Sequence, residues 1–455
     1  MSDADVRRVI DAVWRIESAR LIAGLTRIVR DVGLAEQLAH DALVAALEQW
    51  PAAGIPANPG AWLMAAGRNR AIDHLRRARR LERSHAEIGR EREAAARDDA
   101  AELDAAIDND LGDDVLRLIF MTCHPVLPTE ARVALTLRLL GGLTTDEIAR
   151  AYLTTEPAIA QRIVRAKRTL SEKKIPFEVP RGRDRADRLA SVLEVIYLVF
   201  NEGYTATAGD DWTRPALCED ALRLARVLAG LAPDEPEVLG LAALLELQSS
   251  RLRARVGPSG EPILLLDQNR ALWDPLLIRR GLAALDRGLA TFDLGLTTLD
   301  LRLTTFDVSL TNFDRGHAAR DRAPRADGRP GPYLLQAAIA ACHARARTAA
   351  ETDWPQIAAL YAALAAAAPS PIVELNRAVA ESMAAGPQAG LDIVDRLVHE
   401  PALAGYHLLP SVRGDLLFKL GRHAEARAEF LRAAALTRNA REQTLLQSRA
   451  RACDV

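Results

Sequence analysis

Residues 142–170, GLTTDEIARAYLTTEPAIAQRIVRAKRTL, decide the fold of one part of this chain. Thr144 and Glu147 have the spacing of a capping box, in which two side chains satisfy free backbone N–H groups at the start of a helix. A break at LTT follows, and Pro157 then opens a second helix, since proline fits the first helical turn. Two helices joined by a turn of this length predict a helix-turn-helix.

The second helix of this motif is basic, which suits contact with nucleic acid. Arginine donates two hydrogen bonds to a guanine edge, glutamine suits adenine, and backbone N–H groups at a helix start favour phosphate. The candidate DNA-binding residues are Thr155, Glu156, Gln161, Arg162, Arg165 and Arg168. An ordinary helical hairpin with a solvated basic face is the alternative interpretation.

A second basic helix is expected over residues 60–80, GAWLMAAGRNRAIDHLRRARR. Asn58 is a suitable N-cap and Pro59 a suitable first helical residue. Small and apolar positions are interleaved with arginines, as in a helix that packs on one side and meets phosphates on the other. Trp62 fits a core position as well as a platform for an unstacked base, and the terminal arginines also fit a merely solvated helix end.

The composition of the whole chain favours an all-α fold. Its 455 residues are enough for about two to four domains. Aromatic residues make up 4% and alanine is frequent, while alternating Val/Ile/Thr runs are scarce, which argues against a sandwich or barrel. The four cysteines lie far apart, so a disulfide scaffold or a zinc finger is excluded. With no signal peptide and no long apolar run, we expect a cytoplasmic protein without membrane contact.

Charge is distributed unevenly along the chain. The formal net charge is -2, which by itself argues against a nucleic-acid partner. Residues 81–115, however, hold twelve acids against four arginines, and we expect an acidic linker there. The segments before and after it are net basic. The net charge of the whole chain therefore does not exclude a nucleic-acid partner. We expect the acidic linker to shield the basic helices.

The C-terminal part, residues 187–455, is rich in alanine and leucine, with helical periods punctuated by proline and glycine. The spacing of small and large residues in tetratricopeptide (TPR) repeats occurs twice. One helical pair fits at Gly414, Leu417, Gly421, Ala426, Phe430 and Ala433, and half of another at Ile357, Tyr361, Leu364 and Pro369. The intervening pair around Gly386 fits poorly. Stacked pairs of this kind form a concave surface suited to peptides or partner helices.

Five seven-residue units run from residue 282 to residue 316, each with leucine first and aspartate fifth. Such a repeat predicts either a short coiled-coil-like helix with a function of its own, or a tandem duplication tolerated as an insertion at the surface. The Thr-Thr pairs have poor helix propensity, which favours the insertion.

Together, the two basic motifs resemble the extracytoplasmic-function (ECF) sigma factors, the reduced sigma-70-type promoter-specificity subunits of bacterial RNA polymerase. The resemblance is carried by WLMAAGRNRAIDHLRR, followed after the linker by LTTDEIA and AQRIVRAKRTL. It implies sigma region 2 at residues 1–80, an acidic linker at 81–115, and a region 4 helix-turn-helix at 116–180. Residues 187–455 are similar to the long TPR-like C-terminal extension of one ECF group.

The resemblance also implies roles for individual residues. Region 2 would bind the β′ clamp helices of core RNA polymerase and read the −10 promoter element, while region 4 would read the −35 element and meet the β flap. The implied polymerase-binding residues are Glu36, His40, Asp41 and Leu43. The implied −10 residues are Trp62, Arg68, Asn69, Asp73, Arg76 and Arg77, with Asp73 orienting an arginine.

The expected function is promoter-specific transcription initiation, regulated in cis by contact of the C-terminal domain with the sigma domains or the polymerase. We find no spacing typical of a catalytic or metal site, so we expect no enzyme activity, no cofactor and no metal. A helix-turn-helix regulator that binds duplex DNA without polymerase is the alternative. A small-molecule sensor in the C-terminal domain is compatible with either.

Overall fold

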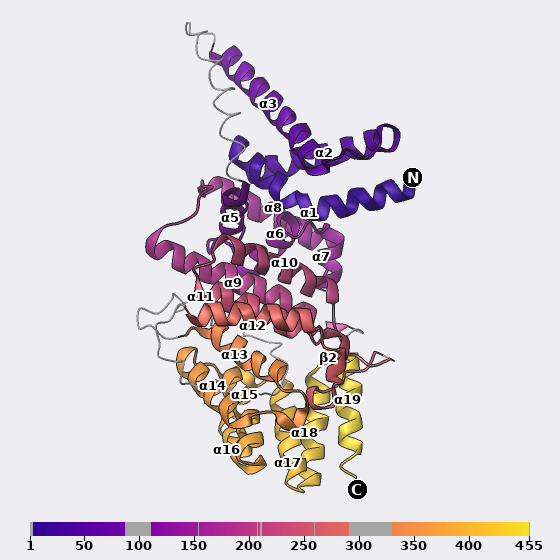
Figure 1. Ribbon diagram of the computed structural model, residues 1–455, viewed down its shortest axis with the longest axis vertical. Coiled ribbons are helices and arrows are strands. Elements are labelled where there is room, and N and C mark those ends of the chain that lie inside the picture. Colours follow the sequence, from indigo (N-terminus) through magenta and orange to yellow (C-terminus); the bar gives the residue numbers. More distant parts are fainter. Residues whose placement is uncertain are drawn as a thin grey trace. The chain divides into compact units, whose positions relative to one another are not determined.

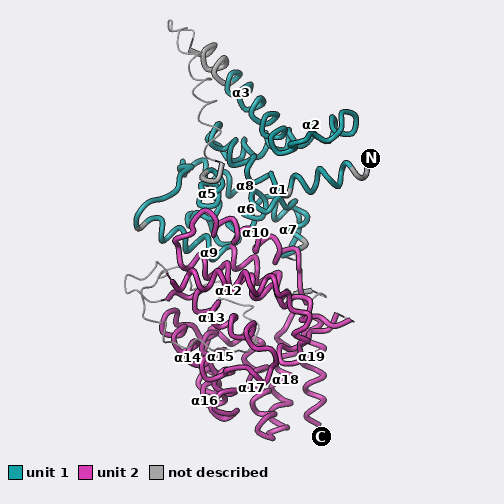
Figure 2. Tube along the Cα trace, viewed as in Figure 1, with its two compact units in different colours: residues 1–195 teal, residues 196–455 magenta. Residues whose placement is uncertain are grey.

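The computed structural model describes residues 3–86, 111–290 and 330–454, except 153, 207, 210, 211 and 259. These residues are almost entirely helical, which confirms the predicted all-α class. The strands β1 (Ala208–Gly209) and β2 (Arg438–Asn439) pair in parallel over two residues. In the described part of the chain, no helix is long and apolar enough to cross a bilayer. The fold has two compact units, residues 1–195 and 196–455 (Figure 2), which we describe separately.

The first unit begins with three packed helices, α1 (Asp3–Val29), α2 (Val32–Ala53) and α3 (Pro59–Ala86) (Figure 1). The side chain of Asp31 caps α2 by accepting a 2.8 Å hydrogen bond from the Leu34 N–H. Asn58 does the same for α3, accepting from the Ala61 N–H at 3.1 Å. The predicted cap at Asn58 is therefore confirmed.

Four shorter helices follow in the same unit: α5 (Leu111–Thr122), α6 (Thr129–Leu139), α7 (Thr145–Ala151) and α8 (Glu156–Glu172). The predicted capping box is present before α7. The Thr144 N–H donates to the Glu147 carboxylate at 2.8 Å, and the Glu147 N–H donates to the Thr144 hydroxyl at 3.1 Å. Helices α7 and α8 pack together as the expected helix-turn-helix.

The helices extend into both ends of the predicted acidic linker. Helix α3 continues to Ala86 and α5 already begins at Leu111. Asp114, one of the acids assigned to the linker, is fully buried and pairs with Arg27 at 3.2 Å and Arg117 at 2.7 Å. Residues 87–110 lie outside the described residues.

Helix α9 (Gly182–Tyr204) belongs to both units, since the boundary falls within it. In its first half, the Ser191 hydroxyl donates to the Cys123 carbonyl at 2.5 Å. In its second half, the Tyr197 hydroxyl donates to the Gln336 side-chain carbonyl at 2.9 Å. The predicted extension, starting at residue 187, therefore begins inside a helix of which the first turns pack in the N-terminal unit.

The second unit is built around α11 (Pro236–Ser249), which is buried from Val238 to Ser249. Helices α10 (Pro215–Leu231), α12 (Pro275–Ala290) and α13 (Pro332–Arg345) pack on it. The carboxylate of Glu237 accepts hydrogen bonds from the backbone N–H groups of Tyr333 and Leu334, at 2.9 and 3.1 Å. This acid on α11 thereby caps the start of α13.

Successive helical hairpins complete the second unit. They are formed by α14 (Trp354–Ala367), α15 (Pro371–Ala385), α16 (Pro387–Leu397), α17 (Leu408–Lys419), α18 (His423–Leu436) and α19 (Ala440–Arg451). In the pair α17–α18, a Cβ at Gly414 would lie 3.0 Å from the Phe430 ring, so glycine allows the close approach. This contact agrees with the predicted TPR-like spacing.

The pair around Gly386, which the repeat pattern fits poorly, is nevertheless a hairpin of the same kind. Helices α15 and α16 pack closely, and Gly386 makes the turn with a φ of 101°. A Cβ at Gly390 would lie 2.6 Å from the Ala378 carbonyl oxygen, so here too a glycine permits the contact. Small residues at the helix crossing therefore preserve the hairpin, although the TPR-like spacing of large residues is absent there.

The first of the five seven-residue units, residues 282–288, is part of α12. Its Leu285 is 1% exposed and belongs to the core, so this unit is not inserted material. Leu289 and Ala290, with which the second unit begins, also belong to α12, and residues 291–316 lie outside the described residues.

Candidate nucleic-acid interface

Helix α8 has one buried and one exposed face. Its buried residues are Ile159, Ile163, Ala166 and Leu170. On the opposite face, Gln161, Val164, Arg165 and Arg168 are all exposed, at spacings of three and four residues that place them side by side. Val164 is 61% exposed although it is apolar. A helix that enters a DNA groove needs such a free face of polar, basic and apolar side chains.

Two other predicted residues lie at the start of α8. Thr155 is the exposed N-cap residue, and its side chain makes no capping hydrogen bond. Glu156 accepts a 2.9 Å hydrogen bond from the Thr145 hydroxyl, and so links α8 to α7. Arg162 is half-buried and lies at the edge of the exposed face, about 100° from Gln161 around the helix but one turn from Arg165.

Arg168 is engaged at one edge of this exposed face. Its Nε donates to the Glu172 carboxylate at 2.6 Å, one helical turn further on. That hydrogen bond raises the pKa of the already cationic guanidinium. Because the side chain remains largely exposed, a phosphate can compete for the guanidinium with Glu172.

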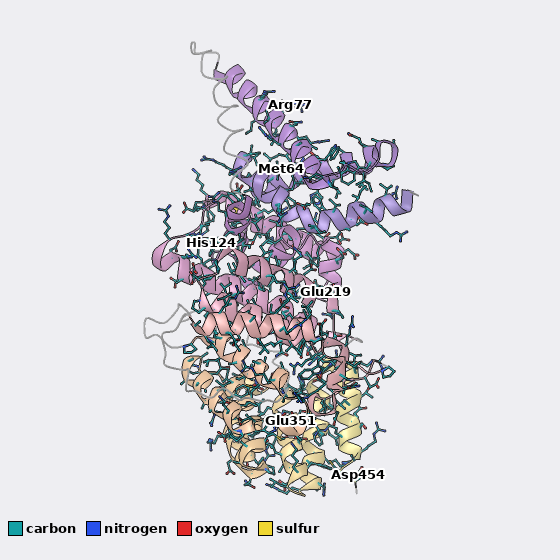
Figure 3. All side chains as sticks on the ribbon, viewed as in Figure 1. Met64, Arg77, His124, Glu219, Glu351 and Asp454 are labelled. Atoms are coloured by element: carbon teal, nitrogen blue, oxygen red, sulfur yellow. The ribbon has the colours of Figure 1, made fainter. Side chains whose placement is uncertain are left out.

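The predicted contacts on α3 fall largely on one stripe. Trp62, Asn69 and Arg76 are seven residues apart, which is close to two full turns. Asn69 and Arg76 are exposed, and Asp73 lies 3.9 Å from Arg76, as expected for an acid that orients an arginine. The exposed Arg77 lies next to this stripe. Figure 3 shows Arg77 on the distal part of α3, away from Met64 near the start of the helix.

Trp62 has features of both roles that the sequence allowed, a core residue and a platform for an unstacked base. Its ring meets the buried Trp50 ring edge to face, with centroids 5.4 Å apart and planes at 73°. The side chain is nevertheless only half-buried, so part of it stays accessible. Arg68 is also half-buried and lies about 100° from Asn69 around the helix, so the structure does not bring it into the stripe.

The acidic residues predicted on α2 are divided between two environments. Glu36 is 5% exposed and lies between two cations from later helices. The Nε of Arg138, on α6, donates to its Oε1 at 2.7 Å, and the ammonium of Lys167, on α8, pairs with Oε2. Asp41 is exposed and Leu43 is half-buried. Only Asp41, of these acids, faces solvent.

His40 shares the environment of Glu36. Its Nδ1 lies 2.8 Å from the Glu36 carbonyl oxygen and its Nε2 lies 2.9 Å from Nη2 of Arg138. Burial, together with the guanidinium, lowers the pKa of His40 from 6.5 to about 4. The ring is therefore neutral at pH 7, with Nε2 accepting from Arg138. Burial also lowers the pKa of Lys167, to about 8.

Comparison with known families accounts for three segments of the chain. Residues 15–81 match the sigma-70 region 2 family and residues 117–170 match the sigma-70 region 4 family. Residues 188–289 match a family of unknown function, DUF6596. The chain is also 43% identical over 432 residues to an uncharacterized protein of Rhizobium meliloti (strain 1021), covering 94% of this chain and 91% of that protein.

The chain belongs to the sigma-70 family. Regions 2 and 4 of this family make it an RNA polymerase sigma factor, and imply RNA polymerase and promoter DNA as its partners. Helices α1 to α3 are region 2, and α5 to α8 form the region 4 segment with its helix-turn-helix. The C-terminal extension starts with the DUF6596 match, which ends at residue 289 and thus includes the first seven-residue unit.

Reasoning from the sequence missed three exposed apolar residues at these sigma surfaces, Val164 on α8 and Val44 and Leu47 on α2. Val164 lies among the predicted −35 contacts on α8. Its spacing of three residues from Gln161 could have placed it on the same helix face from the sequence alone. Val44, which is 51% exposed, lies on α2 on the same side as Asp41 and the exposed Glu48. Single exposed apolar side chains are common on protein surfaces, so these residues support a partner-binding surface only together with the polar and charged residues beside them.

The extension of this sigma factor contains a cavity of about 240 Å³ within the second unit. It is lined by residues of the 262–267 loop and of α15, α17 and α19, among them the ion pair of Asp415 with Lys419 and Arg449. Its volume is below the range of about 300–1,000 Å³ typical of drug-sized ligand sites. Among the described residues, no group of three or more His, Cys, Asp or Glu is arranged to hold a metal ion.

Proposed function

We propose that this chain is an ECF-group sigma factor that recognises the −35 element with α8 and the −10 element with α3. The observation that carries the proposal is the exposed stripe on α8, formed by Gln161, Val164, Arg165 and Arg168 opposite a fully apolar buried face.

In the −35 complex, Gln161 reads an adenine edge and Arg165 a guanine edge or a phosphate. Val164 contacts a thymine methyl group, the apolar feature that the major groove offers. Thr155, at the start of α8, brings a hydroxyl and nearby backbone N–H groups to a phosphate. Glu156 holds the angle between α7 and α8 and does not contact DNA. Arg162 and Arg168 contribute to the backbone contacts.

In the −10 complex, the α3 stripe binds the displaced strand. Arg76 and Arg77 neutralise phosphates, and Asp73 keeps Arg76 in place. The accessible part of Trp62 stacks on an unpaired base, while its contact with Trp50 fixes the ring. Asn69 lies between them and hydrogen-bonds a base edge. Arg68 lies outside the stripe, about 100° from Asn69 around the helix, and stabilises α3.

The polymerase contact is assigned to α2. Asp41, Leu43 and Val44 form its accessible part and bind the β′ clamp helices, while Glu36 and His40 join them when region 4 has moved away. Region 4 then meets the β flap. The C-terminal helical domain regulates the sigma factor in cis, through the concave surface that stacked helical pairs are expected to form.

Transcription with core RNA polymerase tests the proposal. The full-length chain is added to core polymerase and a library of randomised promoters, and we expect a paired −35 and −10 motif among the transcripts. Arg165→Ala should lose the −35 part of the motif, whereas Lys173→Ala, an equal charge change at the exposed end of α8, should keep it. Recovery of a duplex-binding site without core association would instead support a polymerase-independent regulator.

Cis regulation is tested by removing the extension. The cut is best placed after Tyr204, because a cut near residue 180 would remove Ser191 and Glu194 from their partners on α6. Circular dichroism establishes that the shortened chain is folded. Equal promoter-dependent activity of the folded truncation and the full chain would contradict regulation by the extension.

A further inference from the structure

We propose that the cavity in the second unit is a binding site for a small amphipathic acid, a molecule with one carboxylate and a short apolar chain. This extension cavity lies between the 262–267 loop and helices α15, α17 and α19. The apolar chain of the ligand lies between the loop and the helices, and its carboxylate meets Lys419 and Arg449 at the rim. The site is separate from the promoter and polymerase contacts and does not depend on them.

The floor of the extension cavity consists of apolar side chains from alternate helices of the second unit. Each is at most 8% exposed and belongs to the large hydrophobic core of these hairpins: Val379, Leu408, Val412, Leu416 and Leu446. The packing of the hairpins thus holds the floor in place. An apolar chain placed on it would be removed from water on that side.

The opposite wall is the loop, which is fixed by contacts of its own. The Ile263 N–H donates to the Arg255 carbonyl at 2.8 Å. Leu265 packs with Ala254 and Trp273 in a small cluster that is separate from the core of the hairpins. The two walls therefore belong to two different cores, and the space between them stays open.

The size of this space suits a small molecule. Protein interiors are close-packed, and side chains beside a void lose the contacts that a neighbour would supply. An apolar cavity of about 150 Å³ is already large enough to bind benzene. The extension cavity has a volume of about 240 Å³ and can accept a somewhat larger apolar group. Ligands of drug size are excluded, because their sites are larger.

The rim of the extension cavity has an excess of positive charge. Asp415 on α17 pairs with Nζ of Lys419 at 2.8 Å and with Nη2 of Arg449 on α19. Although burial opposes its charge, these two cations lower the pKa of Asp415, so it is ionised at pH 7. Two cations thus share one carboxylate. All three side chains are partly exposed, so an anionic group can approach them from solvent.

The other charged groups of the lining leave this excess at the rim in place. Glu442 is buried, accepts a 2.6 Å hydrogen bond from the Thr437 hydroxyl and lies 2.9 Å from Nε2 of His407. Asp267 is exposed, so water and salt screen its charge. Arg255, which is 2% exposed, adds a further cation to the wall. A carboxylate is therefore favoured at the rim, whereas an ammonium group would meet like charges.

Calorimetric titration of the full-length chain with octanoate tests the site. Octan-1-ol and octylamine carry the same chain with a neutral or a cationic end. Ser411→Leu adds an apolar side chain to the wall of the cavity and should exclude octanoate. Ser448→Leu makes the same change at an exposed position of α19 that does not line the cavity, and is the matched control.

The rim is tested by Lys419→Gln, with Arg451→Gln at an exposed position of α19 outside the cavity as its control. Octanoate should bind the parent chain and both controls alike, and Ser411→Leu at least tenfold more weakly. Lys419→Gln should weaken octanoate binding about three- to fivefold and leave octan-1-ol binding unchanged. Hexanoate, which is two methylene groups shorter, should bind the parent chain about tenfold more weakly than octanoate. Circular dichroism establishes that each variant is folded.

Equal octanoate affinity of Ser411→Leu and the parent chain, or no binding to the parent chain, would overturn the site. Octan-1-ol or octylamine binding as tightly as octanoate would overturn the carboxylate contact. Affinity that rises with chain length equally in the parent chain and Ser411→Leu would show adsorption to exposed apolar side chains instead. The titration contains neither polymerase nor DNA, so its result is independent of the proposed function.

Discussion

The Nη1 atom of Arg132 on α6 lies 3.2 Å from Oε2 of Glu194 on α9. The same guanidinium bonds the hydroxyls of Ser191 and Thr129, and Arg132 is only 6% exposed. An arginine buried to this extent needs its partners, because a buried charge without them is costly. The start of α9 is therefore part of the N-terminal unit.

Arg132→Ala should lower the free energy of unfolding of the first unit by about 2–3 kcal/mol, since Ser191 and Glu194 lose a shared charged donor. Chemical denaturation followed by circular dichroism measures it. Arg181→Ala, at an exposed position before α9, is the control and should cost less than about 0.5 kcal/mol. Equal stability of the two variants would show that the buried contact does not stabilise the unit.

Trp62→Ala should weaken binding of the holoenzyme to single-stranded −10 DNA by about 1–3 kcal/mol, the usual value of one base-stacking contact. Trp62→Phe should retain most of the binding, because a phenyl ring still stacks. Fluorescence anisotropy with a labelled oligonucleotide measures both. A thermal melt of each variant separates this effect from the loss of the Trp50 contact, and binding that follows the melting temperature alone would argue for a purely structural tryptophan.

Val164→Ala should weaken binding to the −35 duplex by about 1 kcal/mol, the value of roughly one buried methylene group. Replacing one thymine by uracil, which lacks the methyl group, should have the same effect at the contacted position. The two changes together should cost no more than either alone, because they remove the same contact. Strictly additive losses at every thymine would contradict the methyl contact.

Acidification should destabilise the first unit at the contact between α2 and α6. His40 has a pKa of about 4 in the folded chain, against 6.5 for an exposed histidine. A lowered pKa means that the unfolded chain binds the proton more readily. The contribution of His40 to stability is therefore fully present above pH 6.5 and is lost as the pH falls towards 4. Between pH 7 and pH 5 the loss should be about 1–2 kcal/mol.

The groups around His40 define the control for this pH dependence. Arg138 faces the ring from α6 and Trp14 from α1, with ring centroids 5.1 Å apart, while Glu36 and Asp41 flank it on α2. His40→Gln keeps a hydrogen-bonding side chain without this titration. The free energy of unfolding, measured by chemical denaturation, should fall between pH 7 and pH 5 by about 1–2 kcal/mol more in the parent chain than in His40→Gln. The same pH dependence in both would assign the loss of stability to other groups.

Local features of the fold were predictable because their causes are local. Asn58 and the pair Thr144–Glu147 cap helices that start one to three residues away, so spacing alone identifies them. The exposed stripe of α8 follows from its period of 3.6 residues in the same way. The hairpin at Gly386 was harder, since it depends on one small residue, Gly390, at a crossing point between helices.

The environment of the polymerase-binding residues was not predictable from spacing. Arg138 and Lys167 are 102 and 131 residues away from Glu36 along the chain, and nothing in their own neighbourhoods marks them as its partners. An acid on an amphipathic helix is ordinarily solvated. Only the packing of α6 and α8 on α2 turns Glu36 into a buried charge, and with it changes the pKa of His40.

The hydrogen bonds from Tyr333 and Leu334 to Glu237 fix the point at which the chain rejoins the core after α12. That point is set by an acid of α11 and not by the residues that precede α13. A change in the length of a connecting segment costs little, since each doubling of a loop costs only about 0.6 kcal/mol in closure entropy. We therefore expect that seven-residue units beyond the first can be removed without unfolding α12 and α13.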